Sequence, residues 1–281
     1  MSPTDTLAFM PPVPGTPAPA PALPASYTGR PIITLTTDFG TSDFYVAAMK
    51  AVLLRACPEA RLIDVTHAVP RHDILCGSIT LERAVDGFPP GTTHLAVIDP
   101  GVGTTRPLLV AEINQQRVVC PDNGLITWSW RRHGGGKAYE LTWRPAREPS
   151  NTFHGRDIMA PAAGMLAAGV ALEGLTRPIE APVLLQVSPT DGAAGTARII
   201  HVDAFGNATT DLSHELLGER RIKAVRIKGR DLGRLKRTYW DVPPGKPLAL
   251  IGSSGLLEIA VRDGSAAQDL GLRVGDEVNV E

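Results

Sequence analysis

Residues 31–43 read PIITLTTDFGTSD, and this stretch decides the fold class. The segment Ile32–Thr37 is apolar or β-branched throughout, which is typical of a buried strand, and a polar turn follows it directly. The next segment, Phe44–Ala56, has helical periodicity, and Arg61–Val65 is again a strand-like run. A strand, a helix and a second strand at this spacing predict an α/β fold with a parallel sheet covered by helices.

The same alternation continues along the chain. Further predicted elements are a helix at Ile74–Val85, a strand at His94–Ile98, a hairpin of Leu108–Ile113 with Arg117–Cys120, and a last helix at Met159–Ala168. We therefore expect residues 31–187 to form an N-terminal α/β domain with a largely parallel central sheet.

After Val187 the pattern of the sequence changes. Short strand-like runs dominate, namely Ala197–Val202, Ile222–Ile227, Pro247–Ile251, Leu257–Val261 and Glu277–Val280. Residues 188–281 are therefore predicted to form a second, all-β domain, either a small barrel or a sandwich. The first 30 residues hold 8 of the 25 prolines and only two charged side chains, which favours a disordered or polyproline tail.

Composition excludes several classes of protein. The chain has 281 residues, 43% of them hydrophobic, and its 28 Lys and Arg against 29 Asp and Glu give a net charge of −1. Such a chain has no broad positive field for a phosphate backbone, so we expect no nucleic-acid partner. The apolar runs are too short to cross a membrane. Three scattered cysteines, Cys57, Cys76 and Cys120, indicate reduced thiols in a cytoplasmic protein, and no histidine spacing indicates a metal site.

Polar, turn-forming clusters follow the ends of the apolar strands, where α/β proteins build their sites. The first is Thr36–Gly40, TTDFG. A carboxylate such as Asp38, at the end of a strand, can accept two hydrogen bonds from a ribose diol. The alternative is that Asp38 caps the helix that begins near Phe44.

The second and third clusters supply an acid, a permanent cation and a group that titrates near neutrality. The DPGVGTTR loop holds Asp99 and Arg106, and its proline and glycines fix a tight turn that can bring the two together. The TFHGRD segment holds His154 at the start of a helix, with Asp157 near its first turn. Taken singly, the first of these clusters is simply an ion pair and the second a helix cap. Together, they are the parts needed to orient and deprotonate a water molecule.

The fourth cluster lies in the second domain. It is the segment Asp203–Asn207, DAFGN, echoed by Gly252–Glu258, GSSGLLE. Its aromatic, amide and carboxylate groups suit a purine or an amino-acid moiety, although turn chemistry explains the Gly, Asn and Ser equally well. The segment Pro121–Gly124, PDNG, is most simply a turn before a helix-like run.

In this order, TTDFG, VIDPGVGTTR, PDNG, TFHGRD, DAFGN and GSSGLLEIA closely resemble the motifs of the S-adenosyl-L-methionine (SAM) hydroxide adenosyltransferases. These adenosine-forming SAM hydrolases are relatives of the SAM-dependent fluorinases and chlorinases. The resemblance spans about Pro31 to Val280. It implies an α/β domain followed by a β-barrel, a homotrimer, and SAM bound between the first domain of one subunit and the second domain of its neighbour.

The resemblance also assigns roles to residues. It implies that Asp99, Arg106 and His154 form a catalytic triad and that Asp38 binds the ribose. The implied substrate-binding residues are Asp38, Phe39, Asn123, Phe153, Asp203, Phe205, Asn207, Ser253, Ser254 and Glu258. SAM is then the substrate, so no cofactor and no metal are implied.

Two features favour hydrolysis over halogenation. An acid and a base stand at Asp99 and His154, where the resemblance gives the halogenases apolar or neutral groups, and an ionised Asp99 would repel a halide. The loop between Glu112 and Val118 is also too short for the insertion that marks fluorinases. We therefore predict hydrolysis of SAM to adenosine and L-methionine. The alternatives are a chlorinase-like SAM-dependent halogenase and a non-catalytic SAM- or nucleoside-binding protein.

Overall fold

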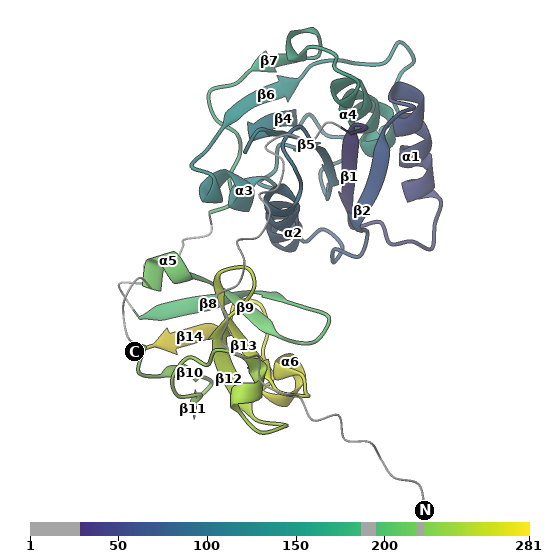
Figure 1. The fold of residues 1–281 in the computed structure, drawn as a ribbon. Coiled ribbons are helices and arrows are strands. Elements are labelled where there is room, and N and C mark those ends of the chain that lie inside the picture. Colours follow the sequence, from purple (N-terminus) through teal and green to yellow (C-terminus); the bar gives the residue numbers. More distant parts are fainter. Residues whose placement is uncertain (1–28, 187–194, 218–221) are drawn as a thin grey trace, which may run out of the picture.

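The computed structural model describes residues 29–186, 195–217 and 222–281, and these form two domains, each built on one sheet (Figure 1). The predicted α/β class is confirmed. The predicted tail of residues 1–30 lies almost wholly outside the described residues, and so does the predicted domain boundary at residues 187–188. Those two boundaries stay predictions.

The first sheet has seven strands in the order β2-β1-β3-β5-β4-β6-β7. Their bounds are β1 Ile32–Thr37, β2 Arg61–Thr66, β3 Thr93–Val97, β4 Leu108–Ile113, β5 Gln116–Pro121, β6 Lys137–Leu141 and β7 Thr176–Pro178. Strands β2, β1, β3 and β5 are parallel, as expected, whereas β4, β6 and β7 add an antiparallel side. The β4–β5 connection is the two-residue turn Asn114–Gln115, so the short loop predicted there is confirmed.

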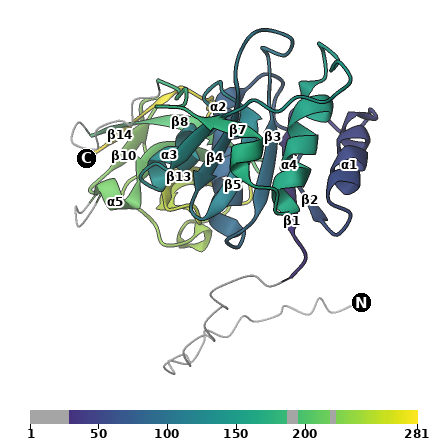
Figure 2. The ribbon, with the colours of Figure 1, turned by 90° about the horizontal axis from the view of Figure 1, so that it is seen from above.

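Helices cover both faces of this sheet (Figure 2). They are α1 Tyr45–Ala56, α2 Ile74–Gly87, α3 Thr127–Arg132, the π-helical stretch η1 Gly155–Met159, α4 Ala160–Ala167 and the 3₁₀ turn η2 Leu172–Gly174. Helices α1 and α4 pack against each other, and α2 packs against α3. Alternate residues of β3 divide between two cores: Leu95 and Val97 join the α1/α4 core, and Ala96 joins the α2 core. This burial on both faces is typical of parallel strands.

The second sheet is antiparallel and curled into a half-barrel, in the order β11-β10-β14-β8-β9-β13-β12. Its strands are β8 Thr196–Val202, β9 Ala208–Ser213, β10 Val225–Ile227, β11 Arg230–Asp231, β12 Pro247–Ile251, β13 Leu256–Val261 and β14 Glu277–Val280, with short helices α5 His214–Leu217, η4 Tyr239–Asp241 and α6 Ala266–Asp269. A bridge between Lys236 and Leu250 ties the segment after β11 to β12. Of the two predicted forms, the barrel therefore describes this domain and the sandwich does not.

Helix α2 joins the domains, because its outer face contacts β8. Ile79 of α2 packs in one apolar cluster with Ile200 and Leu256 of the second domain. Beside it, the Sγ atom of Cys76 lies 3.7 Å from Nδ1 of His201. No helix within the described ranges is long and apolar enough to span a bilayer.

Candidate active site

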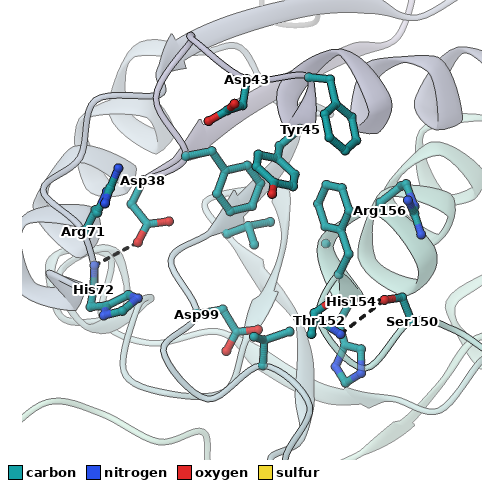
Figure 3. A pocket seen from close by; sticks show the side chains of 16 residues that line it. Asp38, Asp43, Tyr45, Arg71, His72, Asp99, Ser150, Thr152, His154 and Arg156 are labelled. Carbon is teal, nitrogen blue, oxygen red and sulfur yellow. Dashed lines mark hydrogen bonds between the residues drawn. The ribbon is translucent and has the colours of Figure 1, made fainter.

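The carboxyl ends of β1 and β3 open onto a cavity of about 560 Å³ (Figure 3), a volume typical of small-molecule sites. Its walls are the turn after β1, the start of α1, the loop before α2, the turn after β3 and residues 150–156. Of the sequence-predicted residues, Asp38, Phe39, Asp99, Phe153 and His154 line it. Parallel strands end at one sheet edge, which is why segments far apart in the sequence meet here.

Asp99 and Arg106 form a two-point ion pair beneath the cavity. Nε of Arg106 donates to Oδ1 of Asp99 at 2.5 Å, and Nη2 donates to Oδ2. The side chains are only 5% and 11% exposed, respectively. A bidentate pair in a nearly dry site is rigid, because the planar guanidinium fixes both carboxylate oxygens at once.

His154 joins this pair, so the ion pair is not an isolated one. Nη2 of Arg106 lies 3.4 Å from Nδ1 of His154. Because a guanidinium only donates, Nδ1 is the acceptor, and the neutral ring carries its proton on Nε2. Burial, and then the charge of Arg106, lower the pKa of His154 below its ordinary value of 6.5. The imidazole is therefore neutral at pH 7.

The two loops that carry this triad touch at Gly103. Its φ is +81°, and a Cβ there would lie 2.4 Å from the carbonyl oxygen of Asn151. Only glycine allows this approach. Farther along, Oδ2 of Asp157 accepts the Ser150 backbone N–H at 2.9 Å, while Arg156 pairs with the same carboxylate. Asp157 lies in the first turn of η1, as expected, and fixes the loop that leads into it. Because η1 begins after His154 without any side-chain cap, the capping arrangement considered for this segment is wrong.

Asp38 lies across the cavity from His154 (Figure 3). Its Oδ2 accepts the backbone N–H of His72 at 2.8 Å. Within the described part of the chain its other oxygen has no hydrogen-bond partner, so it remains available to a ligand. The capping alternative for Asp38 is wrong, because α1 begins after Phe44 without any side-chain cap.

Aromatic rings line the rim between Asp38 and His154. Phe39, Tyr45 and Phe153 make mutual edge-to-face contacts with ring centroids 5.3–6.1 Å apart, and Phe44 stacks on Tyr45. Both Phe44 and Tyr45 are exposed, and such rings can stack on a base or sugar. The sequence predicts them only as the start of a helix, although two consecutive aromatics shortly after the TTDFG turn were a usable signal.

Among the other lining residues that were not predicted as site residues are Arg71, His72 and Arg156. The guanidinium of Arg156 lies 4.9 Å from the ring centroid of Phe153, a cation–π contact that holds the arginine at the rim. Arg71 and His72 belong to the loop before α2. Nothing in their local sequence indicates that this loop crosses the turn of Asp38.

The remaining predicted residues do not line this cavity within one chain. The Asp203 carboxylate accepts the backbone N–H groups of Phe205 and Asn207 and the Asn207 amide, which shapes a turn that presents Phe205, 79% exposed. Asn123 also serves its own turn, because its amide donates to the Ile98 carbonyl at 2.9 Å. A substrate role for these side chains stays a prediction.

Glu258 lies in β13 of the second domain. Its Oε1 accepts the Tyr239 hydroxyl at 2.6 Å. Burial raises the pKa of Glu258 and, together with this bond, raises the pKa of Tyr239 to about 12. Ser253 is exposed, and Ser254 accepts the Leu256 backbone N–H within its own turn at 3.4 Å. Among the described residues, no group of three or more His, Cys, Asp or Glu is arranged to hold a metal ion.

Comparison with known proteins matches both domains to one family. Residues 33–176 match the SAM hydroxide adenosyltransferase N-terminal domain, and residues 197–279 match the C-terminal domain of the same family. A protein of Thermus thermophilus named (R)-S-adenosyl-L-methionine hydrolase is 39% identical over 265 residues, covering 89% of this chain and 99% of the relative. A protein of the same name from Salinispora tropica is 40% identical over 259 residues, covering 89% and 97%.

More distant relatives and solved structures agree. A fluorinase of Actinopolyspora mzabensis is 27% identical over 292 residues, covering 89% of this chain and 97% of the relative. The crystal structure of an uncharacterized conserved protein from Thermotoga maritima superposes with a TM-score of 0.83 at 34% identity, covering 89% of this chain and all of the other. By these matches across both domains, the chain belongs to the SAM hydroxide adenosyltransferase family.

Proposed function

We propose that this protein hydrolyses SAM to adenosine and L-methionine. The observation that carries the proposal is that Asp99 and His154 line the same cavity as Asp38, while Arg106 behind them bonds to Asp99 and contacts His154. The name shared by the curated relatives at 39–40% identity supports the same reaction.

The reaction balances without any cofactor, because SAM itself carries the leaving group. The water oxygen attacks the 5′ carbon of the ribose in line with the carbon–sulfur bond. That bond breaks, its electron pair stays on the sulfonium sulfur, and methionine leaves as a neutral thioether. The proton lost by the water passes to the triad. Holding the ribose and one water in line turns a bimolecular encounter into an intramolecular step, which supplies much of the rate.

The triad favours water over a halide as the nucleophile. The ionised carboxylate of Asp99, fixed by Arg106, accepts a hydrogen bond from water but repels an anion. The neutral ring of His154 adds a second polar group to the same wall. Since Arg106 holds its partners before substrate binds, these groups need little rearrangement when charge moves during attack.

We also propose that the active form is a homotrimer in which a neighbouring subunit completes the cavity with its second domain. Two observations support this. The cavity is lined by the first domain alone, and the second domain exposes Phe205 and Trp240, at 79% and 77%. Light scattering should give the mass of three chains. We place the protein in the cytoplasm because Cys57, Cys76 and Cys120 are all free thiols.

The reaction is tested by incubating the protein with SAM in ¹⁸O-labelled water, with and without chloride. We expect adenosine and methionine in equal amounts, with the label in the 5′ hydroxyl of adenosine. The Asp99→Ala variant is the negative control. Formation of 5′-chloro-5′-deoxyadenosine would instead identify a halogenase, and binding of SAM without any product would identify a binding protein.

A further inference from the structure

The loop between β2 and α2, residues 67–73, crosses the turn that carries Asp38. The backbone N–H of Gly40 donates to the carbonyl of His67 at 2.7 Å, which fixes one end of the crossing. At the other end, the backbone N–H of His72 donates to Oδ2 of Asp38 at 2.8 Å (Figure 3). The loop therefore binds both the backbone and the side chain of the Asp38 turn.

His72 has an unusual backbone conformation at this contact. It is the third residue of a four-residue turn in which the Asp73 N–H donates to the Pro70 carbonyl at 3.0 Å, and its φ is +64°. Glycine or asparagine is preferred at such a position, because a Cβ crowds the backbone in the left-handed region. The N–H of the third residue is not used inside such a turn, so at His72 it is free to meet Asp38.

We propose that His72 is a positioning residue for Asp38. Its left-handed backbone directs the N–H onto one carboxylate oxygen, which holds the side chain against the wall of the cavity and leaves the other oxygen for a sugar hydroxyl. The identity of that ligand rests on the proposed function. A carboxylate that is already ordered loses less conformational entropy when it binds, so the contact strengthens binding without taking part in the reaction.

The competing explanation is that the imidazole of His72 itself contacts the substrate, since it lines the same cavity. Substitutions separate the two explanations by backbone preference. His72→Gly and His72→Asn remove the imidazole but accept a positive φ, whereas His72→Val resists it. We expect the Gly and Asn variants to keep the adenosine Kd and the KM for SAM within about threefold of wild type. The Val variant should raise both about tenfold, with kcat changed less.

A matched control is Gln115→Val in the β4–β5 turn. Gln115 is exposed, has φ +59° and does not line the cavity. This variant should lower the melting temperature as His72→Val does but leave adenosine binding unchanged. If His72→Val does not fold, His72→Ala provides a milder version of the same test.

The proposal is overturned if the Gly and Asn variants bind as weakly as the Val variant, or if the Val variant binds like wild type. The proposed function fails separately. A wild-type protein that binds adenosine by calorimetry but forms none from SAM would contradict hydrolysis, and the binding series would still decide the role of His72. A wild-type protein that binds neither adenosine nor SAM would overturn both.

Discussion

Arg106 lies between Asp99 and His154 and bonds to both: two of its nitrogens meet the carboxylate of Asp99, and one of these also lies 3.4 Å from Nδ1 of His154. A single cation thus holds the carboxylate of Asp99 in place and, after burial, is the second cause that lowers the pKa of His154. The ion pair is nearly buried, so its rigidity depends on both partners remaining charged. The role of these residues can be tested by substitution.

The role of the Asp99 carboxylate is tested by Asp99→Asn, which keeps the shape of the side chain and removes its charge. We expect kcat to fall by about 10²–10⁴-fold, as is usual when a group that handles a reacting proton is lost. The adenosine Kd should change little, because binding of the ribose is assigned to Asp38. The control is Asp43→Asn, which removes the same charge from the same cavity. A turnover number equal to wild type in the Asp99 variant would remove the mechanism.

Asp38→Ala should show the opposite pattern. Loss of a carboxylate that binds a sugar diol weakens the substrate and the product alike, so we expect the adenosine Kd to rise by about tenfold or more. Isothermal titration calorimetry measures this directly. The prediction is contradicted if Asp38→Ala binds adenosine as tightly as wild type while Asp99→Asn does not.

The lowered pKa of His154 predicts where kcat/KM falls on the acid side of its pH profile. Burial and Arg106 lower the pKa of His154, so the ring gains its proton only below the ordinary value of 6.5. If the neutral ring is required, kcat/KM should stay level from pH 7 down past pH 6.5 and fall only in more acidic buffer. NMR titration of the ring, assigned by its absence in His154→Gln, should follow the same curve. An acid limb above pH 6.5 would contradict this assignment.

Contact between the two triad loops predicts a sharp effect at Gly103. Gly103→Ala would place a methyl group against the Asn151 carbonyl, so the loops must separate and kcat should fall at least about tenfold. Gly91 is a matched control, since its φ of +85° resembles the +81° of Gly103 but no atom lies within 4 Å of the added carbon. Gly91→Ala should lose stability alone. Equal turnover in both variants would show that the close approach is not needed.

The sequence predicted several strands with apolar burial well, although β6, with Ala138 and Leu141 buried, was missed. Ile32–Thr37 and Pro247–Ile251 match β1 and β12 in full. Strand β9, Ala208–Ser213, was missed because three of its five buried residues are polar. Thr210 donates to the Leu257 carbonyl, and Asp211 accepts the Arg198 N–H. Hydrophobic periodicity cannot detect a buried strand whose polar groups are satisfied by its neighbours. The predicted helix Met159–Ala168 also missed the π-helical start at Gly155.

Part of the site was also predictable from local sequence patterns. Asp99, Arg106 and His154 follow strand ends or open a helix, and local turn chemistry marks those places. The bond from His72 to Asp38 depends instead on how the β2–α2 loop crosses the β1 turn. The parallel pairing of β1 with β2 was predictable and brings the two turns to one sheet edge, but the contact of one loop with the other is tertiary and no local pattern encodes it.

A buried histidine away from the site predicts how stability depends on pH. His94, fully buried in β3, accepts a hydrogen bond from Thr34 at Nδ1 and donates from Nε2 to Gln116, both at 2.7 Å. Burial lowers its pKa from 6.5 to about 4. The unfolded chain therefore binds a proton below pH 6.5 that the folded chain resists. The stabilising contribution is complete above pH 6.5 and declines toward pH 4, by about 3 kcal/mol in total.

Urea unfolding of wild type and His94→Gln at pH 7 and pH 4 measures this contribution. Other groups also titrate in this range, so the decisive quantity is the difference between the two proteins in their loss of unfolding free energy. We expect wild type to lose about 3 kcal/mol more than the variant, because only wild type has the buried base. His214→Gln, which removes an exposed histidine of α5, controls for the loss of one imidazole. Parallel pH dependence in wild type and His94→Gln would show that His94 is protonated as easily in the folded protein as in the unfolded chain.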